Sequence, residues 1–220
     1  MAERTARASR EALVDPASPS AEPFRTLRLA LQLRFQSEDT TAVLVTGAES
    51  RDGKSTIAAN YASMSAFGGS RVLLVDADVR NPTQHEIFGI ARSPGLVEYV
   101  ASHAPLDQLV QGVSPQLEVL SAGQAVARAS DVSHSPRIAD LLREASSRYD
   151  VVIFDSAPVL ATADAEAIAA HPGVQIVFVV DESSRRRNVA KAMRKFELIH
   201  ARVAGLVLNR SGDPVAYYGH

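Results

Sequence analysis

A run of residues early in the chain joins an apolar strand to a loop suited to holding phosphate groups. The segment 43–47 leads into Ala48, four further residues, Gly53, Lys54 and Ser55. This spacing matches the P-loop pattern, in which backbone N–H groups and the start of a helix surround nucleotide phosphates. Lys54 can reach the β- and γ-phosphates, and the Ser55 hydroxyl is placed to ligate Mg²⁺. The sequence therefore predicts a nucleotide site.

Three acidic residues follow apolar strands farther along the chain. Asp76 and Asp78 end one strand, and Asp155 ends another. Ligands of parallel sheets bind at the carboxyl ends of the strands, so these acids should face the nucleotide. Asp155 suits the coordination of Mg²⁺. The second pair exceeds what a simple nucleotide switch requires and supplies a group that can accept a proton from an attacking hydroxyl.

Alternating strands and helices must position these groups. Apolar runs without polar alternation predict strands that are buried on both faces, at Arg71–Asp76, Leu117–Leu120, Val151–Asp155, Val174–Val180 and Val203–Leu208. Helices are expected at Lys54–Ser65, Pro94–Ala101, Pro136–Arg148, Asp164–Ala170 and Ser184–His200. This order predicts the α/β class, with a mostly parallel β-sheet and helices on both faces, as in P-loop NTPases.

The composition is that of an ordinary globular domain. The chain has 220 residues, a net charge of -2 and no cysteine, which excludes disulfides and gives no bulk attraction to nucleic acid. We expect a mobile N-terminal lead-in (1–20), one domain (21–210) and a C-terminal tail (211–220). No apolar run approaches the ~20 residues of a membrane span, so a cytoplasmic location is predicted.

A helix expected over 22–36 is apolar on two sides. Leu29 and Leu33 lie off the main apolar stripe. That stripe consists of Phe24, Leu27, Leu31 and Phe35. A helix with two apolar sides needs two packing partners, one of which could be another subunit.

Together these motifs resemble the bacterial tyrosine kinases of capsule and exopolysaccharide export, over about Glu22 to His220. The segments that carry the resemblance are the P-loop, Val75–Thr83, Tyr149–Pro158 and Gly205–Asn209. The Asp-x-Asp-x-Arg motif of Asp76, Asp78 and Arg80 corresponds to the Walker A′ motif, which separates these kinases from most relatives of the same fold.

The resemblance implies an ATP-dependent protein-tyrosine autokinase that regulates polysaccharide polymerisation and export. Lys54 and Asp78 would act in catalysis, with Asp76 as the catalytic base. Ser55, Asp78 and Asp155 would organise Mg²⁺. The residues expected to bind ATP are Ala48, Glu49, Ser50, Arg51, Asp52, Gly53, Lys54, Ser55, Thr56 and Asn209. Asn209 belongs to this set because relatives of the fold often contact adenine there, although a simple turn residue is an equally good interpretation.

The resemblance also implies acceptors and partners. Tyr217 and Tyr218 would be phosphorylated in trans between subunits. Glu22, Arg25 and Arg28 match a Glu-x-x-Arg-x-x-Arg motif that joins family members into a ring. A membrane protein of polysaccharide export would activate the kinase and recruit it to the inner face of the membrane, and a phosphotyrosine phosphatase would oppose it. No nucleic-acid partner is expected.

Two other functions stay open from the sequence. One is a ParA/MinD-type ATPase switch, although that group carries an extra lysine early in the P-loop and this loop begins with Ala48. The other is a non-catalytic nucleotide-binding scaffold of an export complex. Arg51, Ala157 and the loop 123–131 differ from the usual kinase pattern. Altered substrate handling or weak transfer would follow from these differences.

Overall fold

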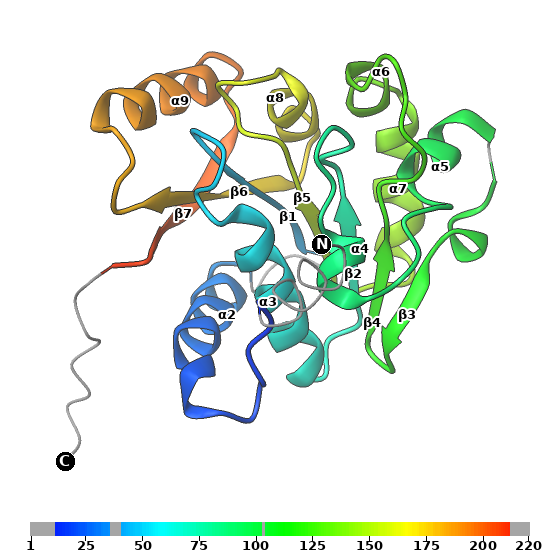
Figure 1. Cartoon of the computed structure of the whole chain (residues 1–220), viewed down its shortest axis with the longest axis horizontal. Coiled ribbons are helices and arrows are strands. Elements are labelled where there is room, and N and C mark those ends of the chain that lie inside the picture. The colour runs from blue at the N-terminus through cyan, green and yellow to red at the C-terminus, as the bar shows by residue number, and fades with distance from the viewer. Residues whose placement is uncertain (1–11, 36–40, 103, 212–220) are drawn as a thin grey trace, which may run out of the picture.

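A parallel sheet forms the centre of the computed structural model, which describes residues 12–35, 41–102 and 104–211 (Figure 1). Within these residues the strand order is β3-β4-β2-β5-β1-β6-β7. The strands are β1 (Thr41–Gly47), β2 (Val72–Asp76), β3 (Gln111–Ser114), β4 (Leu117–Leu120), β5 (Val151–Asp155), β6 (Val174–Asp181) and β7 (Arg202–Asn209). Only the pairing of β3 with β4 is antiparallel among the described strands. The predicted α/β class is therefore confirmed.

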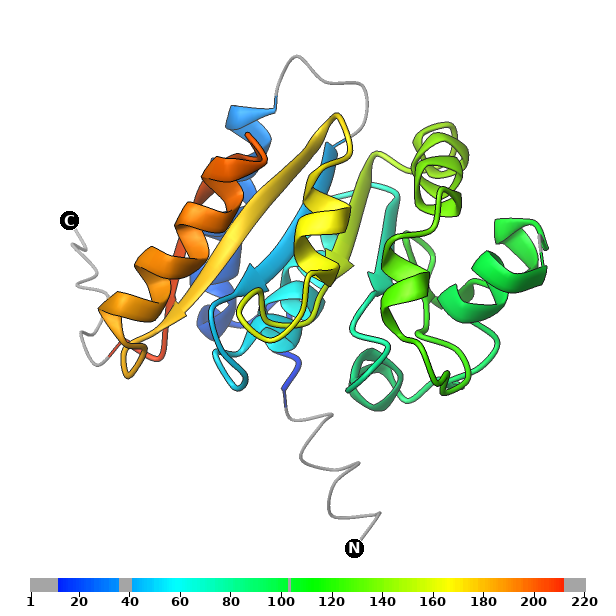
Figure 2. The same cartoon turned by 90° about the horizontal axis from the view of Figure 1, so that it is seen from above.

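Helices cover both faces of the sheet (Figures 1 and 2). The α-helices are α2 (Glu22–Arg34), α3 (Lys54–Phe67), α4 (Gln84–Phe88), α5 (Leu96–Ser102), α6 (Ser130–Ser133), α7 (Arg137–Ser146), α8 (Asp164–Ala169) and α9 (Arg186–Leu198). Short 3-10 helices are η1 (Pro19–Ala21) and η2 (Leu106–Gln108). One apolar core joins α2 and α3 to the sheet, and a second core joins α5 through α9 to the opposite face.

The uninterrupted apolar runs supply both cores at once. In β1, Val43 and Val45 belong to the core beneath α2 and α3, whereas Leu44 belongs to the core on the other face. All three side chains are buried. Successive side chains of a strand alternate between faces, so a strand covered on both sides has no polar positions. This explains why the strand predictions hold for the central strands.

The predictions missed β3, α4 and α6. β3 is a short edge strand whose residues are largely exposed, so it carries no apolar run. α4 has only 5 residues. Its first turn is capped by the carboxylate of Asp76, eight residues before Gln84, and this pairing has no recognisable sequence pattern. The predicted helix 184–200 is shorter in the structure because Ser184 instead closes a turn with Asp181, whose N–H donates to Ser184 Oγ at 3.0 Å.

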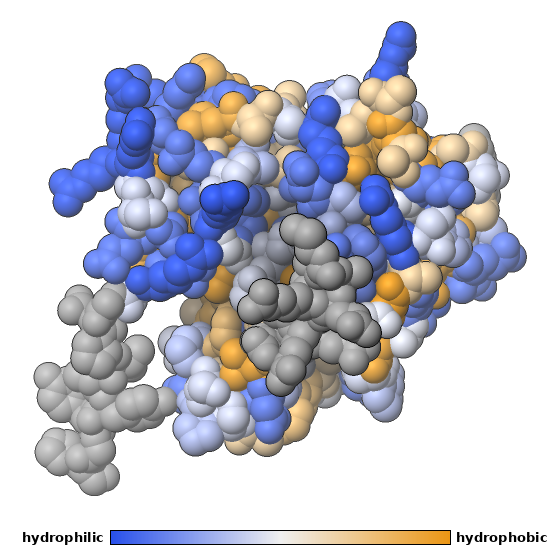
Figure 3. Space-filling model, viewed as in Figure 1, coloured by the Kyte–Doolittle hydropathy of each residue, from blue (hydrophilic) through white to orange (hydrophobic). Residues whose placement is uncertain are grey.

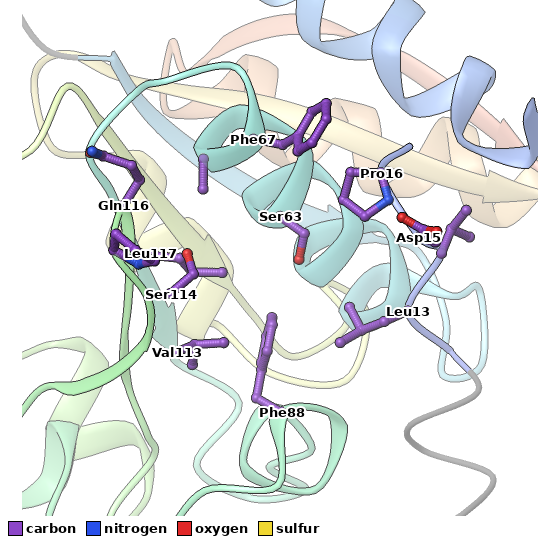
Figure 4. Close-up of a pocket in the computed structure, with 13 residues that line it drawn as sticks. Leu13, Asp15, Pro16, Ser63, Phe67, Phe88, Val113, Ser114, Gln116 and Leu117 are labelled. Atoms are coloured by element: carbon purple, nitrogen blue, oxygen red, sulfur yellow. The ribbon is translucent and has the colours of Figure 1, made fainter. Parts of the chain in front are cut away.

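Part of the lead-in that was predicted to be mobile is attached to the domain. Asn60 of α3 accepts the N–H of Val14 at 2.8 Å and donates to the carbonyl of Ala12 at 2.8 Å. Residues 13–16 border an apolar hollow of about 570 Å³ between α3, α4 and the β3–β4 hairpin. Phe67 and Phe88 also line this hollow (Figure 4). Residues 12–16 therefore belong to the packed structure, which corrects the predicted boundary at residue 20.

The two apolar sides of α2 have different surroundings. Leu31 and Phe35 are buried against α3 and the sheet. Leu29 and Leu33 are 53% and 56% exposed. The second apolar side therefore faces outward from a single chain.

Candidate functional site

The P-loop has the backbone geometry that its sequence predicts. Gly53 precedes α3 with φ 91°, in the left-handed region that favours glycine. A Cβ at this position would lie 2.1 Å from Nδ2 of Asn209. Lys54 begins the helix and is 6% exposed, and its Nζ donates to the carbonyl of Glu49 at 3.2 Å. The ammonium group is thus folded back over the loop.

Side chains from β7 and from the turn before α9 fix this loop from outside. Asp52 accepts the N–H of Glu49 at 2.9 Å and the hydroxyl of Ser184 at 3.2 Å. Nδ2 of Asn209 donates to the carbonyl of Asp52 at 3.0 Å, and Arg210 donates to the carbonyl of Arg51 at 3.0 Å. In this structure the amide of Asn209 holds the P-loop backbone.

Arg51 is a strained member of the loop. Its φ is 72°, a conformation that costs non-glycine residues on the order of 1 kcal/mol. Its side chain is exposed, and so are those of Arg185 and Arg210, which border the same hollow of about 630 Å³. Hydrophilic side chains gather over this end of α9 (Figure 3). The mouth of the site on this side therefore carries both arginines and acids, since Glu49, Asp52 and Asp181 line the same hollow and Arg210 pairs with Asp181 at 3.1 Å.

Two buried acids stand side by side beneath the loop. Asp76 and Asp155 are register partners at the ends of β2 and β5, and both are 0% exposed. Oδ2 of Asp76 accepts the N–H groups of Thr83 and Gln84, each at 3.0 Å, which caps the start of α4. Oδ1 of each acid is buried without a hydrogen-bond partner among the described residues. Two oxygens thus remain unsatisfied in the centre of the site.

Burial strongly shifts the proton affinity of this pair. Burial, and then the neighbouring charge of Asp155, raise the pKa of Asp76 well above its usual range. Burial also raises the pKa of Asp155 to about 6, although hydrogen bonds from Gln84 and Ser55 and the charge of Lys54 oppose this. The pair therefore resists carrying two negative charges unless a cation is supplied.

The remaining residues of the Asp-x-Asp-x-Arg motif have separate roles. Asp78 is 9% exposed, and its Oδ1 accepts the N–H of Asn81 at 3.0 Å. Arg80 turns away from the site and pairs with buried Asp164 at 3.2 Å, which ties the loop after β2 to α8. Arg80 is therefore a structural residue here, whereas Asp78 borders the site.

A cavity of about 760 Å³ brings seven of the predicted nucleotide and metal residues together, but Asp76 and Asp155 are not among the residues that line it. It is lined by Ala12, Ser50, Arg51, Gly53, Lys54, Ser55, Thr56, Asp78, Asn81, Thr83, Ile87, Pro158 and Arg210. Within the part of the chain that is described, no three His, Cys, Asp or Glu side chains converge as a metal cage. Mg²⁺ needs no such cage, because one or two carboxylates and phosphate oxygens suffice. Asp155 lies next to two residues that line the cavity, since a hydrogen bond from Ser55 and the charge of Asp78 both act on its pKa, so these three residues fit that requirement.

Sequence reasoning missed two residues of the site. Gln84 is fully buried, and its Nε2 donates to Oδ2 of Asp155 at 2.7 Å and to the carbonyl of Ser55 at 3.1 Å. Asn188 donates to Glu49 at 2.8 Å from α9. Neither residue belongs to a recognisable motif, so only the fold reveals them.

The residues predicted to join subunits have partners within the chain. Arg25 pairs with Glu22 at 2.7 Å and donates to the carbonyl of Pro16 at 2.8 Å. Arg28 lies against Gly68 at the end of α3, where a Cβ would come within 2.2 Å of its guanidinium. Tyr217 and Tyr218 lie outside the described residues.

Comparison with known proteins first defines the class. Residues 51–203 match the family model described as an AAA domain, consistent with the P-loop and the sheet. The chain is 31% identical over 213 residues to the tyrosine-protein kinase YwqD of Bacillus subtilis, covering 94% of this chain and 90% of that protein. It therefore belongs to the bacterial tyrosine-protein kinase family.

Coverage differs between relatives. The chain is 36% identical over 207 residues to EpsB of Ralstonia solanacearum, which covers 93% of this chain. It spans only 28% of that relative's length.

Solved structures agree with the family. The chimerical protein CapA2B2 gives a TM-score of 0.84 at 31% identity, covering 94% of this chain and 91% of that one. The kinase domain of Escherichia coli ETK gives 0.82 at 27% identity, covering 95% and 84%. MinD of Pyrococcus horikoshii, at 19% identity and a TM-score of 0.65, shares the fold alone. Within the described ranges, every helix is too short or too polar to cross a membrane.

Proposed function

We propose that this chain is an ATP-dependent protein-tyrosine autokinase that uses Mg²⁺. One observation supports this most directly. Two buried acids with unsatisfied oxygens lie beside a P-loop at adjacent strand ends, which is one acid more than a nucleotide switch requires. A P-loop combined with two acids suits phosphoryl transfer to a hydroxyl, since such a reaction needs both charge neutralisation and a proton acceptor.

The residues divide the work as follows. P-loop amides and Lys54 hold the ATP phosphates and stabilise the charge of the transferring γ-phosphoryl group. Ser55, Asp78 and Asp155 hold Mg²⁺, which neutralises phosphate charge when bound. Oδ1 of Asp76, which has no hydrogen-bond partner, accepts the proton of the tyrosine hydroxyl. The tyrosine oxygen bonds to the γ-phosphorus as the bond to ADP breaks, so atoms and charge balance.

The acceptors in this proposal are Tyr217 and Tyr218 of the tail, phosphorylated in trans. Arg210, which lines the ATP cavity, directly precedes that tail. The last described residues before the tail therefore lie at the mouth of the site.

Assembly and partners extend the proposal. The exposed side of α2 carries Leu29 and Leu33, and we assign it, together with Glu22, Arg25 and Arg28, to a ring of subunits. A membrane activator of polysaccharide export would recruit the kinase to the inner face of the membrane, where it regulates polymerisation, and a phosphatase would reset it. Support for these partners comes from the family resemblance.

The test is incubation with Mg²⁺ and γ-labelled ATP, followed by mapping of phosphotyrosine. Label on Tyr217 or Tyr218 is expected in the wild type and should fall by at least about a thousandfold in Lys54→Met, since lost phosphate contacts affect the barrier directly. Lys191→Met, which removes an exposed lysine of α9, is the matched control. Equal labelling of Lys54→Met and wild type would refute the assignment.

A further inference from the structure

Gln84 donates a hydrogen bond to the Oδ2 atom of each buried acid of the site. Its side-chain Nε2 donates to Oδ2 of Asp155 at 2.7 Å. Its backbone N–H donates to Oδ2 of Asp76 at 3.0 Å. In each acid the other oxygen, Oδ1, is left without a partner among the described residues. One residue therefore selects which oxygen of each carboxylate remains available.

The side-chain amide of Gln84 also connects Asp155 to the P-loop helix. Nε2 of Gln84 donates to the carbonyl of Ser55 at 3.1 Å, in the first turn of α3. Gln84 itself begins α4 and is 0% exposed. The buried side chain of Gln84 thus joins β5 to α3, and its backbone N–H joins the same residue to β2. Because α4 is capped by Asp76, the position of Gln84 and that of the acids depend on each other.

This arrangement has a cost that calls for an explanation. Oε1 of Gln84 is buried without a hydrogen-bond partner in the described part of the chain. An unsatisfied buried acceptor destabilises a fold by on the order of 1–3 kcal/mol. A leucine or methionine would fill similar space without that cost. The amide supplies instead a donor that prevents the carboxylate of Asp155 from rotating.

We propose that Gln84 is a positioning residue for Mg²⁺, an inference that rests on the proposed function. By holding Oδ2 of Asp155, it presents Oδ1 to the ion beside Ser55. Partners that orient metal-binding carboxylates typically contribute 10- to 100-fold to metal affinity. Gln84 acts through Asp155 and touches neither substrate nor phosphate in this assignment.

Gln84→Met tests the proposal, because methionine keeps the volume and removes the donor. The measurement is binding of a fluorescent ATP analogue during titration with Mg²⁺, compared with binding in EDTA. We expect the Mg²⁺ concentration for half-maximal binding to rise about 10- to 100-fold, with binding in EDTA within about twofold of wild type. A residue with a merely structural role would weaken both equally.

Two further variants complete the design. Gln84→Asn retains a polar start to α4, but its shorter amide cannot span Ser55 and Asp155, so it should show the same Mg²⁺ defect even where Gln84→Met folds poorly. Gln111→Met removes another bonded amide, which donates to the carbonyl of Ala91 at 2.7 Å far from the site, and should leave Mg²⁺ dependence unchanged.

The outcomes separate this proposal from the proposed function. Wild-type Mg²⁺ dependence in both Gln84 variants overturns the role of Gln84 alone. Equal loss of binding with Mg²⁺ and in EDTA also overturns it, in favour of a structural role. Absence of Mg²⁺-dependent binding in the wild type would instead remove the proposed metal site itself.

Discussion

Neutralising one of the two buried acids should make the metal-free protein more stable. A pKa of about 6 for Asp155, in place of 3.8, means that the ionised side chain costs the folded state about 3 kcal/mol well above pH 6. Because the folded-state pKa of Asp155 is raised, protonation of this side chain favours the folded state. That stabilisation is fully present below pH ~4 and is lost as the pH rises through about 6. The substitution Asp155→Asn removes the ionisable group and therefore this pH-dependent loss of stability.

The expected gain is about 1–3 kcal/mol at pH 8, since the asparagine amide remains buried. For a domain of this size, that corresponds to a rise in melting temperature of roughly 3–10 °C. The assay is thermal unfolding in EDTA without nucleotide, at pH 5 and at pH 8. The gain should be larger at pH 8, and Mg²⁺ with ATP should stabilise the wild type more than the variant.

Asp150→Asn is the control with the opposite sign. Asp150 pairs with Arg71 at 2.6 Å, and the hydrogen bond from that guanidinium lowers the pKa of Asp150. This variant should be no more stable than the wild type at pH 8. The reasoning is refuted if Asp155→Asn is less stable than the wild type at pH 8, or if its gain is the same at both pH values.

Other predictions concern the P-loop backbone. Arg51→Gly should raise stability by about 1 kcal/mol, measured by urea unfolding, because its φ of 72° suits glycine; a loss of stability would contradict this. Gly53→Ala should be destabilised and bind ATP at least about tenfold more weakly, because its Cβ would meet Asn209 at 2.1 Å, and unchanged calorimetric affinity would disprove this steric account. Asn209→Ala should weaken ATP binding about tenfold through the loss of its bond to Asp52, and wild-type affinity would show that the bond is unimportant.

The sequence was sufficient for those parts of the fold that a local pattern determines. The P-loop and the central strands follow from residue spacing and from apolar runs such as Val151–Asp155, because a strand buried on both faces has no polar positions. The edge strand Gln111–Ser114 lacks such a run and was missed. The order of the strands depends on contacts between distant segments, which no local pattern records.

The site was predictable where a motif names its residues and not where the fold alone brings them together. Lys54, Ser55 and Asp78 border one cavity, and their roles there stay predictions. Gln84 was missed because a single glutamine after a turn matches no motif. Its role becomes visible only in the fold, where Asp76 accepts the N–H of Gln84 at the start of α4. Nor could the sequence show that Asp76 is fully buried, since its burial depends on helices supplied by other parts of the chain.

The most direct test of the kinase assignment is the fate of the γ-phosphoryl group. The purified 220-residue chain is incubated with Mg²⁺ and γ-labelled ATP, and phosphotyrosine and free phosphate are quantified over time in the wild type and in Asp76→Asn. We predict phosphotyrosine in the wild type and a selective loss of it in Asp76→Asn, with ATP still bound. Release of free phosphate without phosphotyrosine in the wild type would contradict the kinase and indicate an ATPase switch.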